Sequence, residues 1–234
     1  MSIAENIARV RERIAVAARH AGREPSAITL MAVSKTFPPE YIREAYAAGI
    51  RIFGENRVQE FAAKADPVRD LTDAEWHLIG HLQSNKAAKA AELFAAVDSL
   101  DSVHLAERLN AAAARARKTL PALIEINVGG EEAKSGVAPC SEELEQILTS
   151  APQWKNLAIR GLMTVPPYTD NPEDARPFFR HLRQLRDEIA ARHLSGVSMD
   201  VLSMGMSHDF EVAIEEGSTC VRAGKAIFGE RGRK

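Results

Sequence analysis

Eight short apolar segments recur along the chain, and a stretch with helical periodicity separates each from the next. We expect strands at residues 28–35, 51–56, 76–80, 93–100, 122–128, 159–165, 201–207 and 220–229. We expect helices between them at 39–48, 56–65, 84–92, 103–118, 141–150, 173–193 and 208–216. Strands that alternate with helices form parallel sheets through right-handed crossovers. Eight such repeats in 234 residues predict a closed (β/α)8 TIM barrel, with an open doubly wound sheet as the alternative.

The turn after the first predicted strand argues against the open sheet. That fold usually has a glycine-rich turn there, and "VSKTFPP" has no glycine. Before this strand, an extra N-terminal helix is predicted by apolar residues at helical spacing, namely Ile3, Ile7, Val10 and Ile14. No linker marks a second domain, so we expect one domain over residues 1–234. The irregular stretch 165–174, "VPPYTDNPED", is predicted to be a loop at the barrel mouth.

Composition and charge narrow the classes of partner. Thirty basic and 32 acidic side chains give a net charge of −2, which does not favour nucleic acid or an anionic membrane. No run of about 18 apolar residues predicts a membrane span, and charged residues interrupt the N-terminal helix as they would not interrupt a secretory signal. Cys140 and Cys220 form neither a disulfide framework nor a metal motif. We therefore expect a cytoplasmic protein without a metal.

Polar residues gather at the carboxyl ends of the predicted strands, where barrels of this class place their active sites. Reading those ends gives Lys35, Glu55, Asn56, His81, Asp98, Asn127, Met163, Thr164, Ser207 and Arg222. Asp98 and the nearby Asp101 are interpreted as residues that cap, or hydrogen-bond to, the following helix. The other polar residues would form a ring around the barrel mouth, and this favours a functional role for Lys35. Taken alone, a lysine at a strand end would be interpreted as a solvent-exposed residue.

A lysine in a barrel mouth suits imine formation with a carbonyl compound. The amine is nucleophilic only when neutral, and burial near a cation such as Arg222 favours the neutral form. Ser207 would cap the following helix beside free backbone N–H groups, and Gly224 would let the backbone approach a ligand closely. Barrels commonly bind phosphate at the loops after strands seven and eight. A sugar phosphate and pyridoxal phosphate both remain candidates at this point.

Seven sequence blocks carry a more specific resemblance. They are "LMAVSKT", "FGENRVQE", "WHLIGHLQSNK", "INVGGEEAKSG", "GLMTVPP", "LSMGMSHDFEVAI" and "VRAGKAIFGER", in this order along nearly the whole chain. The sequence closely resembles the pyridoxal phosphate homeostasis proteins of the YggS/PROSC type. These are relatives of the N-terminal barrel of alanine racemase, a fold-type III pyridoxal phosphate-binding barrel.

The resemblance implies a role for each candidate residue. Lys35 would carry pyridoxal 5'-phosphate as an internal aldimine, and Asn56 would line the pocket beside it. Ser207, Gly224 and the backbone of Lys225 would hold the phosphate, and Arg222 would face the pyridine nitrogen. This chain has Ala223-Gly224-Lys225 where the family usually has Ile-Gly followed by Thr, Ser or Arg. In a regular strand, Lys225 would point away from the side that Arg222 occupies.

The implied function is cofactor binding in intracellular pyridoxal phosphate homeostasis, with little catalytic turnover. Apo forms of pyridoxal phosphate-dependent enzymes are candidate partners, and we expect a monomer. Racemisation by two bases is the alternative. In alanine racemase the base opposite the lysine is a tyrosine from a second domain, which we do not expect here, so Tyr168 or a water would have to serve. A Schiff-base aldolase without a cofactor is the third hypothesis.

Overall fold

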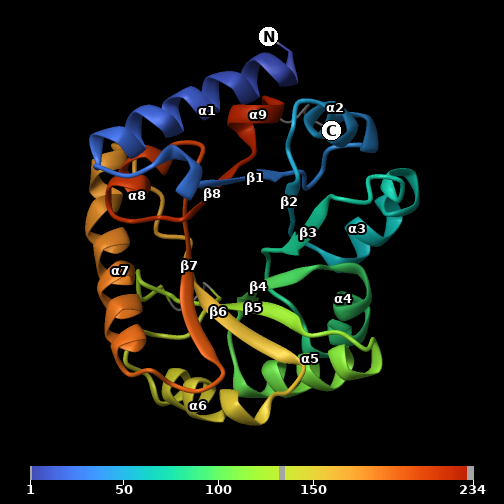
Figure 1. Cartoon of the computed structure of the whole chain (residues 1–234), viewed down its shortest axis with the longest axis vertical. Coiled ribbons are helices and arrows are strands. Elements are labelled where there is room, and N and C mark those ends of the chain that lie inside the picture. The colour runs from blue at the N-terminus through green and yellow to red at the C-terminus, as the bar shows by residue number, and fades with distance from the viewer. Residues whose placement is uncertain (1, 132–134, 231–234) are drawn as a thin grey trace.

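The computed structural model describes residues 2–131 and 135–230 and contains a closed, all-parallel β-barrel. Part of the "INVGGEEAKSG" block therefore lies outside the described residues. The strands are β1 (Thr29–Val33), β2 (Ile52–Glu55), β3 (Glu75–Leu78), β4 (Ala96–Leu100), β5 (Leu120–Glu125), β6 (Leu157–Met163), β7 (Val197–Met206) and β8 (Cys220–Ala223). They pair in sequence order, and β8 closes the barrel on β1 (Figure 1). The (β/α)8 prediction is confirmed, and the open-sheet alternative is wrong.

Helices connect the strands and cover the outside of the barrel. They are α2 (Pro39–Ala47), α3 (Val58–Lys64), α4 (Ala87–Leu93), α5 (Val103–Arg115), α6 (Glu142–Ser150), α7 (Arg176–Ala191) and α8 (Phe210–Glu215). Each predicted inter-strand helix is present, with short 3₁₀ turns at Ser84–Lys86 and Pro172–Ala175 replacing the first turn of two of them. Each longer helix turns one apolar face inward, as shown by the buried Ile42, Leu109, Ile147 and Leu182. None of the described helices is both long and apolar enough to cross a membrane.

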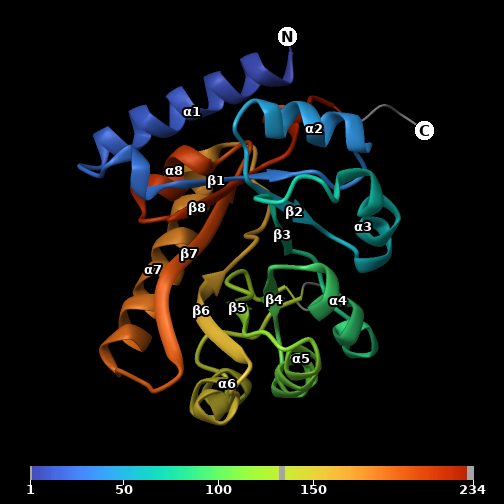
Figure 2. The ribbon, with the colours of Figure 1, turned by 45° about the vertical axis from the view of Figure 1, so that its right-hand side comes forward.

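An additional helix, α1 (Ile3–His20), packs across the place where β8 meets β1 (Figures 1 and 2). A capping box between Ser2 and Glu5 starts it. Its buried face consists of Ile3, Ile7, Val10, Ile14, Ala17 and Ala18. Asn6 Nδ2 donates to the carbonyl of Ile227 at 2.9 Å, and Arg13 pairs with Glu211 of α8 at 2.6 Å. The predicted N-terminal helix is confirmed, and it joins the beginning of the chain to the end.

The last predicted strand, 220–229, is wrong in its second half. β8 ends at Ala223, and a short helix, α9 (Lys225–Phe228), follows. The amides of Ile227 and Phe228 donate to the carbonyl of Gly224 at 3.0 and 2.9 Å, so the backbone coils instead of continuing along β1. The apolar run was too short for its periodicity to distinguish strand from helix.

Candidate functional site

A cavity of about 660 Å³ opens at the carboxyl ends of the strands, within the size range of small-ligand sites. All six sequence-predicted site residues line it: Lys35, Asn56, Ser207, Arg222, Gly224 and Lys225. The sequence reasoning missed several further lining residues, among them Val33, Phe37, Ile79, Val165, Met206 and His208. The apolar members of this second group gave no chemical signal in the sequence, because such residues also fill ordinary cores.

Lys35 lies in a tight turn just beyond the end of β1. Ser34 N donates to the carbonyl of Gly54 in β2 at 3.0 Å, and Phe37 N donates back to the carbonyl of Ser34 at 3.1 Å. Between them, Thr36 has a φ of +68°, in the left-handed region that β-branched residues rarely adopt. The chain then enters α2 at Pro39. The turn places the partly buried Lys35 at the barrel mouth, two residues beyond the strand end.

Arg222 is the buried cation of the cavity, with 3% of its surface exposed. One terminal nitrogen donates to the carbonyl and hydroxyl of Ser203 at 2.8 and 2.7 Å, and the other donates to the carbonyl of Thr164 at 2.6 Å. These bonds to β7 and to the end of β6 fix the plane of the guanidinium. Burial lowers the pKa of Arg222 from its ordinary value, but that value is so high that the group stays charged at neutral pH.

Ser207 has a different local role from the predicted one. The N-cap of α8 is Asp209, so the expectation that Ser207 caps this helix is wrong. Its Oγ instead accepts the backbone N–H groups of Gly224 and Ala226, each at 3.2 Å. Two accepted bonds leave the hydroxyl hydrogen available to donate to a further oxygen. Ser207 therefore joins the turn after β7 to the turn after β8.

Lys225 stands at the rim of the cavity. Its side chain is 70% exposed, and its Nζ is 2.8 Å from Glu230 Oε1, a contact that raises the pKa of Lys225. Because it begins α9, the strand alternation that predicted its orientation does not apply. Its ammonium group pairs with Glu230 at the surface, whereas the guanidinium of Arg222 is buried.

The placement of Asp98 at the barrel mouth is wrong. Asp98 lies in the middle of β4, and its side chain faces a second cavity, of about 430 Å³, lined by residues at the amino ends of the strands. There His77 Nδ1 is 3.1 Å from Asp98 Oδ1. Burial works against the imidazolium, but the charges of Asp98 and Glu75 outweigh it and raise the pKa of His77 to about 10. Asp98 therefore belongs to an ion pair at the opposite end of the barrel from Lys35.

Asp101 does not cap α5, but it contacts the residue that does. The N-cap is Ser102, whose Oγ accepts the amide of Leu105 and donates to Asp101 Oδ1 at 3.4 Å, and Asp101 Oδ2 is 3.0 Å from His81 Nδ1. Within residues 2–131 and 135–230, no group of three or more His, Cys, Asp or Glu side chains could hold a metal ion. The contact between Asp101 and His81 joins the segments that follow β4 and β3.

Glu125 is a buried carboxyl at the end of β5. It is 8% exposed, and its Oε2 has no hydrogen-bond partner among the described residues. Burial and the charge of Asp101 raise the pKa of Glu125 to about 7, although Arg222 and His81 partly offset them. Glu125 is thus a buried carboxyl whose charge changes close to neutral pH.

The loop at residues 165–174 lies beside the cavity, as predicted, since Val165 is part of the lining. Tyr168 in this loop is 79% exposed, stacks on His208 with ring centroids 5.7 Å apart, and is not part of the lining. His208 Nε2 is also 3.1 Å from the carbonyl of Asp170. These contacts hold the loop against the turn that contains Ser207.

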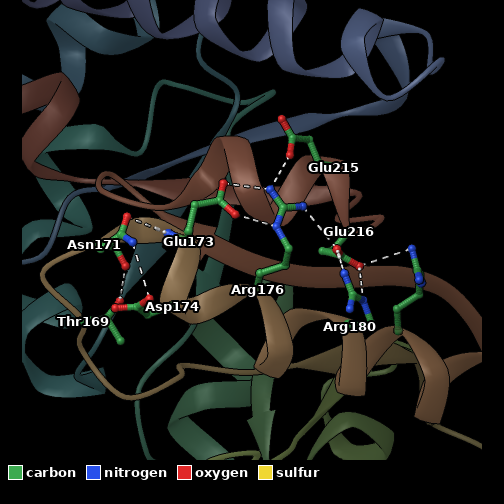
Figure 3. Close-up of polar contacts among 9 residues, drawn as sticks. Thr169, Asn171, Glu173, Asp174, Arg176, Arg180, Glu215 and Glu216 are labelled. Carbon is green, nitrogen blue, oxygen red and sulfur yellow. Dashed lines mark hydrogen bonds and ion pairs between the residues drawn. The ribbon is translucent and has the colours of Figure 1, made fainter.

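An ion-pair network fixes the far end of this loop (Figure 3). Arg176, at the start of α7, binds Glu173 at 2.7 Å and Glu215 of α8 at 2.6 Å. Glu216 accepts from Arg176 at 3.2 Å and from Arg180 at 2.9 Å, and Arg183 lies 3.4 Å away. The network ties the loop, α7 and the end of α8 together.

Comparison with known proteins gives consistent relationships. The family model described as alanine racemase, N-terminal domain, matches residues 6–232. The chain is 48% identical to a pyridoxal phosphate homeostasis protein of Aquifex aeolicus, over 99% of both chains. It is 44% identical to that of Pseudomonas aeruginosa, over 98% of this chain and 96% of the relative.

Solved structures agree with this relationship. PipY of Synechococcus elongatus with PLP bound superposes with a TM-score of 0.84 at 38% identity, over 97% of this chain and 100% of that one. An alanine racemase of Clostridium difficile has a TM-score of 0.74 at 14% identity, over 100% of this chain and 58% of that one, which shows a shared fold alone. From its sequence, its barrel and these relatives, the chain belongs to the pyridoxal phosphate homeostasis proteins of the alanine racemase N-terminal domain family.

Proposed function

We propose that this chain binds pyridoxal 5'-phosphate in the 660 Å³ cavity and serves intracellular homeostasis of that cofactor. The observation that carries the proposal is the meeting of three kinds of group in one cavity. They are the amine of Lys35, the buried cation of Arg222, and hydroxyl and backbone donors around Ser207 and Gly224. The PLP-bound structure of PipY and the names of the relatives support it.

Each residue has a distinct task in this proposal. Lys35 would hold the cofactor covalently through its amine, and the chemistry that the cofactor supplies there is that of an aldehyde. The Ser207 hydroxyl and the backbone N–H of Lys225 would donate to phosphate oxygens, Gly224 would let the backbone approach them closely, and Asn56 would line the space beside Lys35. Arg222 would donate to the ring nitrogen through an N–H group that its bonds to Ser203 and Thr164 do not use.

The charge of Arg222 favours holding the cofactor over catalysis with it. When bound, the cofactor supplies an aldehyde and a ring that can take up electron density. A permanently charged arginine at the ring nitrogen donates a hydrogen bond and leaves that nitrogen unprotonated. An unprotonated ring is a weaker electron sink, so we propose a carrier with little turnover. We also propose that the whole chain acts as one domain; the monomeric state, cytoplasmic location and recipient apo-enzymes stay predictions.

Absorbance and mass spectrometry test the proposal. Adding pyridoxal 5'-phosphate to the apoprotein should produce the absorbance band of an imine, and borohydride reduction should fix the added mass on the peptide that contains Lys35. Lys35→Ala should lose the band and keep its far-ultraviolet circular dichroism, whereas Lys89→Ala, at an exposed helical lysine, should keep both. A labelled peptide without Lys35 would refute the assignment, and a cofactor-free aldolase would show no band.

The racemase alternative predicts rapid exchange of the α-hydrogen of alanine. Tyr168 is exposed and outside the cavity lining, so we expect this exchange to be absent or weak. Loss of one acid–base partner costs about 10²–10⁴-fold in rate. Rapid exchange that Tyr168→Phe abolished would favour the racemase.

A further inference from the structure

A second lysine is buried beneath the turn that carries Lys35. Lys64, the last residue of α3, is 9% exposed, and lysines are seldom buried without a partner. Its Nζ donates to Glu55 Oε1 at 2.8 Å, to the carbonyl of Ser34 at 3.1 Å and to that of Phe37 at 3.5 Å. All three acceptors belong to the ends of β1 and β2 and the turn after β1. Lys64 does not line the cavity.

These bonds bracket Lys35. Ser34 precedes it directly, and Phe37 closes the turn behind it. Ser34 Oγ also donates to Glu55 Oε1 at 2.6 Å. Glu55 therefore accepts hydrogen bonds from both the Ser34 hydroxyl and the Lys64 ammonium. The two carbonyls and the carboxylate hold the turn on both sides of the lysine.

The strained residue of the turn is held by the same helix. The Thr36 amide donates to the carboxylate of Glu60, which lies 3.6 Å from the Lys64 ammonium. A left-handed β-branched residue persists only where its surroundings impose that conformation. Lys64 and Glu60, one helical turn apart on α3, together impose the path of the backbone from 34 to 37.

Stability alone does not account for this ion pair. Two charges removed from water gain little net free energy over well-packed apolar side chains. Glu55 is fully buried, its Oε2 has no partner among the described residues, and burial raises its pKa although Lys64 and Ser34 partly offset that effect. The buried Lys64–Glu55 pair therefore costs the fold free energy. It lies directly beneath Lys35, whose amine must be oriented for the proposed function.

We propose that Lys64 and Glu55 are a positioning pair, whose contacts with the Ser34–Phe37 turn set the direction in which Lys35 enters the cavity. The proposal rests on the proposed function, because it explains how the reacting amine is oriented. A displacement of about 1 Å in a reacting group can cost about 100-fold in rate. Lys64 and Glu55 touch neither the cavity nor the cofactor in this proposal and act only through the turn.

The test compares Lys64→Met with Lys118→Met. Lys118 is also partly buried, and its Nζ donates to a loop carbonyl, that of Phe94, at 2.6 Å, away from the cavity. Stopped-flow absorbance would give the rate of imine formation and the pH midpoint of the imine band. We expect Lys64→Met to slow imine formation by about 10–100-fold and to shift the midpoint. Lys118→Met should leave both unchanged, and Lys64→Arg should restore part of the rate.

Two further measurements keep the test decisive. If Lys64→Met does not fold, the double variant Lys64→Met/Glu55→Leu removes both charges, and it should fold and show the same slow imine formation. Amide hydrogen exchange of the apoprotein should show faster exchange at Thr36 and Phe37 in Lys64→Met than in Lys118→Met. Wild-type imine kinetics in a folded Lys64 variant, or unchanged exchange at these amides, would overturn the inference. Absence of any imine in the wild-type protein would refute the proposed function separately, while the exchange result still decides whether Lys64 orders the turn.

Discussion

Two cations lie three residues apart near the end of β8, and their different surroundings predict different contributions to cofactor affinity. Arg222 is buried and makes three hydrogen bonds, to Ser203 in β7 and to Thr164 just after β6, whereas Lys225 is exposed and paired with Glu230. Loss of a buried charged hydrogen bond costs about 1.5–3 kcal/mol. We therefore expect Arg222→Ala to weaken cofactor affinity by about 10–100-fold and Lys225→Ala by less than about tenfold.

Cofactor titrations of both variants at low and high salt check this expectation. The Lys225 effect should be small at either salt concentration, since its contribution to the phosphate is its backbone N–H. An equal loss in the two variants, strongly dependent on salt for Lys225→Ala, would show that the ammonium leaves Glu230 to bind the phosphate.

Glu125 should make the free energy of unfolding of the apoprotein decrease as the pH rises. Its pKa in the folded protein is raised from 4.5 to about 7, so the folded state holds the proton more tightly than the unfolded state. The resulting stabilisation is complete below about pH 4.5 and is lost as the pH rises through about 7. Its size is on the order of 3 kcal/mol, the free energy of the difference between those pKa values.

Glu125→Gln should remove that dependence. We expect the free energy of unfolding of the variant to fall less between about pH 5 and 8 than that of the wild type, and to exceed it at about pH 8. Urea unfolding at a series of pH values measures both quantities. Parallel curves for the two proteins would mean that Glu125 does not titrate in this range.

At the level of helices and strands, the alternation of strand and helix patterns in the sequence was sufficient to predict the barrel. It was insufficient to predict the residues at which individual elements end. Every predicted strand and helix is present in the structure. The periodicity and length of each apolar pattern reflect which side chains are buried in the barrel or against its outer surface. The ends depend on single hydrogen bonds that no period records. Gly224 turns the chain into α9 through its carbonyl, and Ser207 accepts amides from α9 rather than from α8.

Contacts between segments distant in sequence were also beyond the sequence reasoning. Asp98 has the same local pattern as a strand-end residue, yet its position within β4 directs it to His77 at the opposite end of the barrel. Lys64 looks like an ordinary exposed lysine at a helix end. Only the packing of α3 against the first two strands shows that it contacts the turn of Lys35.

The network between α7 and α8 allows a prediction for a pair of helices. Glu216 is buried; burial alone would raise its pKa, but Arg180 and Arg176 lower it below the ordinary value. We expect Glu216→Gln to lower the free energy of unfolding by about 1–3 kcal/mol at neutral pH, because it leaves arginines without their charged partner. Because the folded pKa is depressed, the difference should be full above about pH 4.5 and shrink as the pH falls.

Denaturant unfolding at neutral and acidic pH measures this difference. Glu173→Gln is the control, since its exposed carboxylate pairs with Arg176 alone in this network and should cost less than about 1 kcal/mol. Equal costs for the two variants would show that Glu216 gains nothing from its burial among three arginines.

Across the whole molecule, the candidate site draws on both ends of the barrel sequence. Lys35 and Asn56 follow the first two strands, and Ser207, Arg222 and Gly224 come from the last two, which are neighbours because β8 pairs with β1. The shared fold with alanine racemase covers this entire chain but only 58% of the racemase. Every residue that lines the cavity belongs to this barrel and the segments that follow its strands.

The contact between α1 and the last two helices has a consequence for how the protein is made. The apolar face of α1 leaves the ribosome well before its partners in α8 and α9. Until then β1 also lacks β8, and the nascent polypeptide presents an unpaired strand and an uncovered helix.

We expect ribosome-bound chains stalled near residue 200 to be cut rapidly by a protease and to retain no cofactor, whereas released full-length chains resist cleavage. Pulse proteolysis of stalled and released chains measures this, and resistance of the stalled chains would show that the first six strands already form a stable unit. Vectorial synthesis would thereby delay cofactor binding until the last strand has left the exit tunnel.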